Sequence, residues 1–204
     1  MSNLSTSFIQ ASPAPTGQRL AVPHANFGMV IFVICEIMFF GGLISAYLVG
    51  SAAAIDSGQA WPPTNQPRLP VEATAFNTFV LLLSGWFMYR TSVTQRQPEG
   101  MAKTKKLLAC TIGLGTFFVL FQGYEWIRLI DYGLTIGSSN FGSFFYLIVG
   151  AHALHVVAAL GALVFVYTQL KQNRLTEGAL GAARIFWYFV VGLWPILYIL
   201  VYLV

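Results

Sequence analysis

The segment that decides the fold is Phe27 to Gly50, which reads FGMVIFVICEIMFFGGLISAYLVG. A helix of this length spans about 36 Å, which is enough to cross the hydrocarbon core of a bilayer. Glu36 is its only charged residue, and a carboxylate at the centre of a membrane helix costs roughly 2.5–3.5 kcal/mol on insertion scales. The sequence therefore predicts that Glu36 is protonated, paired or functional. Small residues follow it at the spacing that lets a helix or a lipid approach closely: Gly41, Gly42, Ser45 and Ala46.

The composition indicates a polytopic membrane protein. Of the 204 residues, 56% are hydrophobic and 9% are charged, the mean hydropathy is +0.68, and soluble domains carry roughly 25% charged residues. The net charge of +4 gives no support for nucleic-acid binding, because the basic residues lie in short loops between apolar segments. Cys35 and Cys110 stand alone in apolar segments, so we expect them to be buried as small apolar side chains.

The chain divides into a polar N-terminal tail, residues 1–25, and a membrane domain, residues 26–204. We predict an all-α fold, a polytopic membrane bundle of five transmembrane helices. In the last helix, Pro195 cannot donate a hydrogen bond to the Val191 carbonyl, so we expect a kink there. The predicted helices cover about residues 27–50, 73–93, 107–130, 141–170 and 182–204.

Lysine and arginine predict the orientation of the chain, because they accumulate in cytoplasmic loops. If the N-terminus is cytoplasmic, nine of the 11 basic residues lie on that side, and only Arg68 and Arg128 lie outside. We therefore expect a cytoplasmic N-terminus and a C-terminus outside. The nine residues are Arg19, Arg90, Arg96, Lys103, Lys105, Lys106, Lys171, Arg174 and Arg184.

Two histidines lie inside the fourth predicted helix, in the motif His152-Ala-Leu-His155. The helical rise of about 1.5 Å per residue places His155 and Glu36 at the same depth. Positions i and i+3 share a helix face, so both histidines are expected to point the same way. Three interpretations stay open: a structural hydrogen-bonded pair, a proton-active or lipid-contacting carboxylate, and a metal site formed by Glu36, His152 and His155.

Three further residues are expected at the membrane interface. Trp61 lies in a proline-rich loop, where an indole favours the headgroup level. Glu125 and Trp126 lie near the outer end of the third predicted helix, in the motif Gln122-Gly-Tyr-Glu125-Trp126. No predicted helix interior contains a lysine, and no nucleotide-binding glycine motif occurs. We therefore predict no catalytic, cofactor-binding or metal-binding residues in this chain.

Several motifs occur together in the order of one known family. They are Gly28-Met29, Cys35-Glu36, Phe39-Phe40, Trp61-Pro62-Pro63, Asn77-Thr78, Gln122-Gly-Tyr-Glu125 and, most specifically, Gly150-Ala-His152-Ala-Leu-His155. With these motifs, the chain resembles subunit III of haem–copper respiratory oxidases, in its five-helix bacterial form. In that family, the glutamate that corresponds to Glu36 reacts with carbodiimide.

The resemblance implies a non-catalytic, multi-pass subunit of the bacterial cytoplasmic membrane. It would pack against oxidase subunit I and contact other subunits such as II. It would support oxygen reduction to water and proton pumping in aerobic electron transport, without haem or copper of its own. Family members hold phospholipid in a cleft near the residues that correspond to Glu36, His152 and His155. The electron donor, cytochrome c or quinol, would bind other subunits, so this sequence leaves it open.

The last predicted helix departs from the family pattern. The family usually has W-H-F-V-D, whereas this chain has Tyr188 and Val191 in place of the histidine and the aspartate. A role of those two groups therefore does not transfer to this chain. Two other functions compete with the oxidase subunit: an accessory subunit of a nitric oxide reductase, and a self-standing small proton or ion transporter that uses Glu36.

Overall fold

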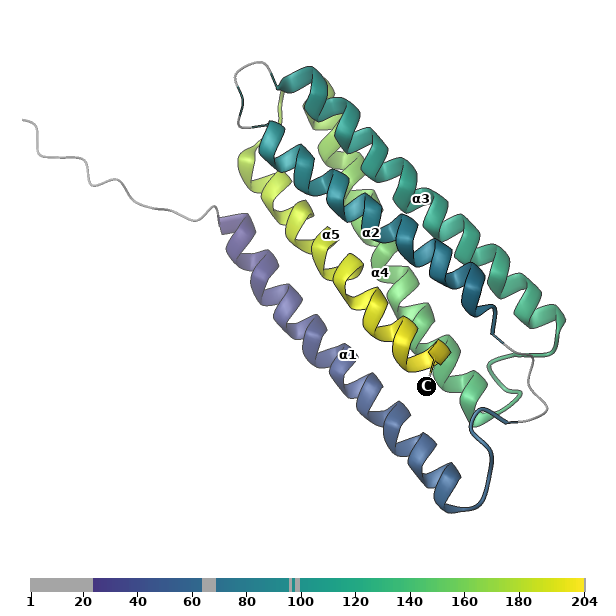
Figure 1. Cartoon of the computed structure of the whole chain (residues 1–204). Helices are drawn as coiled ribbons and strands as arrows, with labels where there is room; N and C mark the ends of the chain where they lie inside the picture. Colours follow the sequence, from purple (N-terminus) through teal and green to yellow (C-terminus); the bar gives the residue numbers. More distant parts are fainter. Residues whose placement is uncertain (1–23, 64–68, 96, 98–99, 204) are drawn as a thin grey trace, which may run out of the picture.

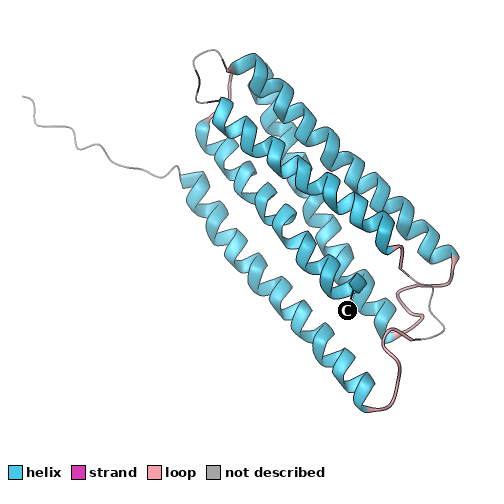
Figure 2. Ribbon diagram, viewed as in Figure 1, coloured by secondary structure: helices cyan, strands magenta, loops and turns pink. Residues whose placement is uncertain are grey.

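The computed structural model describes residues 24–63, 69–95, 97 and 100–203, and within these ranges the chain is helical with no strand (Figures 1 and 2). All five α-helices are long and apolar enough to cross a membrane, the last together with the π-helix that follows it. The predicted all-α bundle of five transmembrane helices is confirmed. The elements are α1 (His24–Asp56), α2 (Val71–Thr94), α3 (Met101–Asp131), α4 (Asn140–Lys171), α5 (Glu177–Tyr198) and the π-helix η1 (Ile199–Leu203).

Several helices extend beyond the predicted spans. Helix α1 continues to Asp56, because the segment after Gly50 is rich in alanine, the strongest helix former. Helix α3 begins at Met101, because its lysines also favour helix. Hydropathy identifies only the apolar part of a helix, whereas the helical backbone can continue beyond it. Of the predicted tail, residues 1–25, residues 1–23 lie outside the described residues. Residues 24 and 25 belong to α1.

Local sequence explains how the last two helices begin. The Ser139 hydroxyl accepts a hydrogen bond from the Gly142 amide at 3.0 Å at the start of α4. The Thr176 hydroxyl accepts one from the Ala179 amide at 3.3 Å at the start of α5. Such caps satisfy amides that have no partner inside the helix. Pro195 lies inside α5, which remains α-helical to Tyr198 and then continues as η1.

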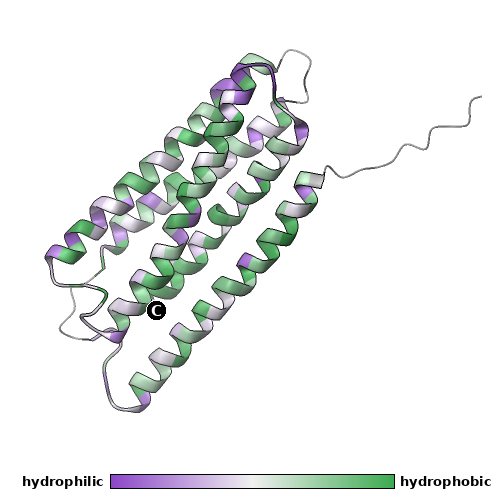
Figure 3. Cartoon of the chain, turned by 180° about the vertical axis from the view of Figure 1, so that it is seen from behind, coloured by the Kyte–Doolittle hydropathy of each residue, from purple (hydrophilic) through white to green (hydrophobic). Residues whose placement is uncertain are grey.

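Helix α5 packs against α1, α2 and α4, whereas α1 lies at the edge of the bundle (Figure 1). In the most apolar stretch of α1 only 6% of the residues are buried, compared with 44% in the corresponding stretch of α5. Among its described side chains only Phe40 and Tyr47 are buried. Figure 3 shows that hydrophobic residues cover most of the length of α1. Cys35 and Cys110 are both exposed, so the prediction that they are buried is wrong for the isolated chain.

Buried polar side chains connect the inner helices. The Asn77 amide of α2 donates to the Phe118 carbonyl at 3.1 Å and to the Gln122 side-chain oxygen at 3.4 Å, both on α3. The Gln122 amide in turn donates to the Tyr202 hydroxyl of η1 at 3.2 Å. Hydrogen bonds between membrane helices contribute about 0.6 kcal/mol each on average, so this network adds stability and fixes which faces meet.

Candidate functional site

Glu36 and His155 form a hydrogen-bonded pair between α1 and α4. The Oε2 atom of Glu36 lies 2.8 Å from Nε2 of His155, and the two side chains are 17% and 15% exposed. The prediction that both residues lie at the same depth is confirmed by this contact. Because α1 has few buried side chains, the pair is a main polar link between this helix and the rest of the bundle.

The second nitrogen of His155 determines where the protons lie. Its Nδ1 atom is 2.7 Å from the Ala151 carbonyl oxygen, which can only accept a hydrogen bond, so Nδ1 carries a proton. The Nε2 atom then either accepts a hydrogen bond from a neutral Glu36 carboxylic acid or, when protonated, donates one to a Glu36 carboxylate. In both cases one proton lies between the two side chains, and the pair is neutral overall. Neutrality lowers the cost of keeping these groups inside a membrane.

Aromatic rings enclose the pair. The His155 ring lies 5.2 Å from the Phe40 ring and 6.4 Å from the Phe186 ring, both nearly perpendicular to it. The Phe39 ring lies 6.3 Å away. These rings come from α1 and α5 and keep the surroundings apolar, which strengthens the hydrogen bond.

His152 shares this face of α4 but has a different neighbour. Its ring is 1% exposed, stacks on Trp194 of α5 at 5.0 Å, and meets the edge of Phe40 at 6.4 Å. Both histidine rings therefore contact Phe40, which confirms the shared face, but only His155 reaches Glu36. Among the described residues no three His, Cys, Asp or Glu side chains come together as a metal site. The geometry favours the paired interpretation of Glu36 over the metal site.

The three residues expected at the interface pack against the bundle. The Trp61 indole donates to the Tyr47 hydroxyl at 3.2 Å and meets the Phe141 ring edge-on at 5.5 Å, so it joins α1 to α4. Glu125 is 4% exposed, and Trp126 is half-buried beside it. Their depth relative to the membrane surface stays a prediction.

Two neighbouring features were not predicted from the sequence. One is Trp194, whose indole supports His152 and donates to the Thr78 hydroxyl at 2.8 Å. The other is an apolar groove of about 420 Å³ between α1 and α5, which begins at Ile37, next to Glu36. On the α1 side, Gly41 leaves the groove open. The spacing of small residues after Glu36 was the sequence feature that could have predicted this side of the groove. The α5 side could not be predicted, because it depends on how α1 and α5 pair.

The fold and the site together define an integral membrane protein whose intramembrane acid and imidazole bind one another between helices. The family follows from comparison with known proteins. The family model for cytochrome c oxidase subunit III matches residues 17–204, and the chain belongs to this family.

Individual relatives agree with this assignment. The chain is 32% identical over 182 residues to the probable cytochrome c oxidase subunit 3 of Mycobacterium leprae, covering 88% of this chain and 87% of the relative. It is 33% identical over 181 residues to the cytochrome c oxidase subunit 3 of Synechocystis, covering 87% and 74%. The Corynebacterium diphtheriae protein of the same name is 30% identical, covering 98% and 99%. The resemblance noted in the sequence motifs is thus confirmed.

Proposed function

We propose that this chain is the non-catalytic integral subunit III of a haem–copper terminal oxidase in a bacterial cytoplasmic membrane. It supports oxygen reduction to water and proton pumping by subunit I, and holds no haem or copper itself. The observation that carries this proposal is the Glu36–His155 pair. The two side chains bind each other and hold a proton, so they act on packing and proton supply and not on electron transfer.

The outer face of α1 is the proposed docking surface for subunit I. Large apolar side chains on this helix are exposed, including Ile34 at 53% and Met38 at 73%. Gly42, Ser45 and Ala46 are also exposed, so a partner helix can approach the α1 backbone closely. Other subunits such as II are further proposed partners, and lipid covers the remaining apolar surface.

The groove between α1 and α5 is a proposed phospholipid site. One acyl chain would lie in the groove, past Gly41 and Gly192, where no heavy atom lies within 4 Å of an added Cβ. Tyr188 lines this groove, and one turn earlier in α5 Arg184 lines a polar cavity of about 280 Å³ that Asn26 also borders. The cavity has two charged side chains in its lining, Glu177 and Arg184, and a phosphate would pair with the Arg184 guanidinium. The site therefore matches the two ends of a phospholipid.

The clustering of basic residues supports the proposed orientation of the chain. Helices α1 and α5 begin at the end of the bundle where α2 and α4 finish (Figure 1). Of the eight described basic residues, only Arg128 lies at the opposite end. The positive-inside rule places the basic end in the cytoplasm, with the N-terminus inside and the C-terminus outside. The phosphate bound to Arg184 would then belong to the cytoplasmic leaflet.

Purification of the tagged chain from its native membrane in a mild detergent tests this function. We expect it to carry subunits I and II and a haem absorption spectrum, with no haem on this chain after the subunits are separated. Co-purification of a nitric oxide reductase would contradict the oxidase assignment. Proton or ion transport by the chain alone in liposomes would indicate the self-standing transporter instead.

A further inference from the structure

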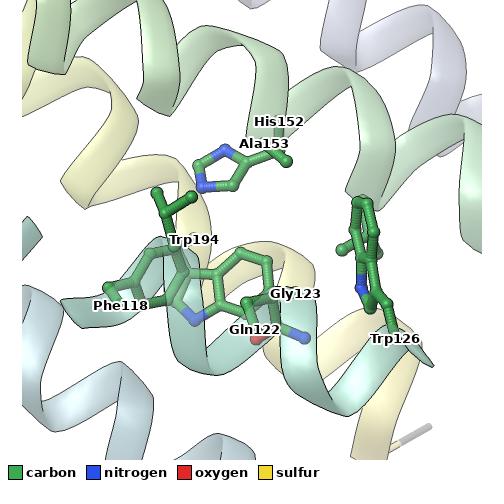
Figure 4. A pocket seen from close by; sticks show the side chains of 9 residues that line it. Phe118, Gln122, Gly123, Trp126, His152, Ala153 and Trp194 are labelled. Carbon is green, nitrogen blue, oxygen red and sulfur yellow. The ribbon is translucent and has the colours of Figure 1, made fainter. Parts of the chain in front are cut away.

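A further cavity lies between helices of the bundle, apart from the groove and from the Glu36–His155 pair, and it opens to the surface beside the part-exposed Gly123, Trp126 and Ala153. It has a volume of about 110 Å³ and lies between α3, α4 and α5. Figure 4 shows the His152 imidazole above the Trp194 indole, with Phe118 beside Trp194 and the Trp126 indole to the other side. The walls are mostly apolar, so the few polar atoms at the cavity decide what it can bind.

Three nitrogens of two residues that line this cavity have no hydrogen-bond partner among the described residues. They are Nδ1 and Nε2 of His152 and Nε1 of Trp126, and all three are buried. A buried donor or acceptor without a partner is strongly unfavourable, and it usually indicates a bound water or ion. Because both residues line the same cavity, a ligand in the cavity is the candidate partner for these atoms.

The chemistry of the lining identifies the ligand. A neutral His152 offers one N–H donor and one acceptor nitrogen, and Trp126 offers a donor. Gln122 also lines the cavity, and its bonds to Asn77 and Tyr202 leave one N–H and one lone pair free. No lysine, arginine or carboxylate lines the cavity, so neither an anion nor a metal ion would find a counter-charge. An acyl chain would satisfy none of these groups.

We propose that the cavity is a binding site for a cluster of water molecules. At about 30 Å³ per water, its volume accommodates about three. Water both donates and accepts, so it can satisfy His152 and Trp126 together. The cluster joins His152 to Gln122 and hence to the buried network of Asn77 and Tyr202. It fixes the His152 ring on Trp194, one helix turn from His155.

A density map of the purified assembly that contains this chain, at a resolution that shows ordered water, tests the site. We expect discrete peaks within hydrogen-bond distance of His152 and of Trp126. Continuous elongated density from a lipid or detergent chain would overturn the proposal. So would a cavity without density in a map that shows buried waters elsewhere. The proposal does not depend on the oxidase function, because the map can come from any assembly in which the chain purifies.

Two leucine variants sharpen the test. Gly123 lines the cavity and has no heavy atom within 4 Å of an added Cβ, so a side chain can start there, and we expect Gly123→Leu to occupy part of the space. The peaks should disappear in this variant. Gly113 is equally open on α3 but does not line the cavity, so Gly113→Leu should retain them. Peaks that persist in Gly123→Leu would contradict the assignment, and the wild-type map decides the question if either variant fails to assemble.

His152→Phe gives an independent measurement. The phenyl ring can keep the stacking on Trp194 but removes both ring nitrogens. If water satisfies these nitrogens, the variant should lose the density peaks beside residue 152. Its midpoint for thermal dissociation of this chain from the assembly should not exceed that of the wild type. A raised midpoint would show that the nitrogens are unsatisfied in the wild type, which contradicts a bound cluster.

Discussion

Glu36 and His155 are 119 positions apart in the chain, and their side chains meet at 2.8 Å. The Ala151 carbonyl fixes a proton on the far nitrogen of the same imidazole. Together these contacts make the pair a neutral unit that holds one shared proton. The pair connects the exposed helix α1 to α4 inside the bundle, so its integrity should affect how this subunit holds its partners.

Replacing one member of the pair should cost more than replacing both. Glu36→Leu or His155→Leu leaves the other half-buried polar group without its partner, which costs at most about 1–3 kcal/mol. The double variant removes both groups, so its loss should be smaller than the sum of the single losses. The midpoint of thermal dissociation of this subunit from the purified complex measures the effect. Strictly additive losses would contradict the coupling.

Glu36 should react with a hydrophobic carbodiimide, which modifies protonated carboxyl groups. Mass spectrometry of the labelled complex should find the adduct at Glu36 in the wild type and none at this position in Glu36→Gln. Glu125→Gln is the matched control, because Glu125 is a second carboxyl group with 4% exposure, on α3. Its removal should leave labelling of Glu36 unchanged. Equal total labelling of Glu36→Gln and wild type would remove Glu36 as the reactive group.

Gly115→Ala should destabilise the bundle. A Cβ at Gly115 of α3 would lie 2.5 Å from a ring carbon of Trp187 and 2.8 Å from a methyl carbon of Leu160. Trp187 is fully buried and cannot move aside easily, so we expect a loss of about 1–3 kcal/mol from overpacking. Gly113→Ala, two residues earlier in open space, should change stability by less than about 0.5 kcal/mol. Similar dissociation midpoints for the two variants would contradict this packing.

Filling the groove between α1 and α5 should displace lipid. Gly192→Leu adds a side chain to the groove where no heavy atom lies within 4 Å, so the helices need not move apart. We expect fewer phospholipids to remain with the purified complex, counted by native mass spectrometry. Gly28→Leu, on an equally open site outside the groove, should keep the wild-type number. An unchanged count in Gly192→Leu would argue against the proposed site.

Much of the fold could be predicted, because a membrane helix carries its signal locally. An apolar segment of sufficient length defines each span, so all five helices were predicted in order. The equal depth of Glu36 and His155 could also be predicted, because helical rise fixes the depth of each residue, whereas their hydrogen bond was one of three interpretations that the sequence left open. Helix ends were predicted less well, since the alanine-rich end of α1 and the lysine-rich start of α3 are helical but less apolar than the segments that identify the spans.

Contacts that depend on which helices are neighbours could not be predicted. Trp194 supports His152 only because α5 packs beside α4, and the sequence does not encode that pairing locally. The same holds for the cavity at Trp126, which needs three helices. The exposure of Cys35 was missed for a related reason: an apolar surface in a membrane protein faces lipid or a partner as readily as the core.

Oxygen consumption by the purified oxidase, recorded over many turnovers together with its absorption spectrum, tests the central claim most directly. Glu36→Ala and His155→Ala should keep the haem spectrum and nearly the full initial rate. Activity should then decline faster than in the wild type, because the loosened pair weakens packing and proton supply around a reaction that another subunit carries out. Immediate loss of the haem signal from a fully assembled complex would show that these residues act at the metal centre, and would contradict a non-catalytic subunit.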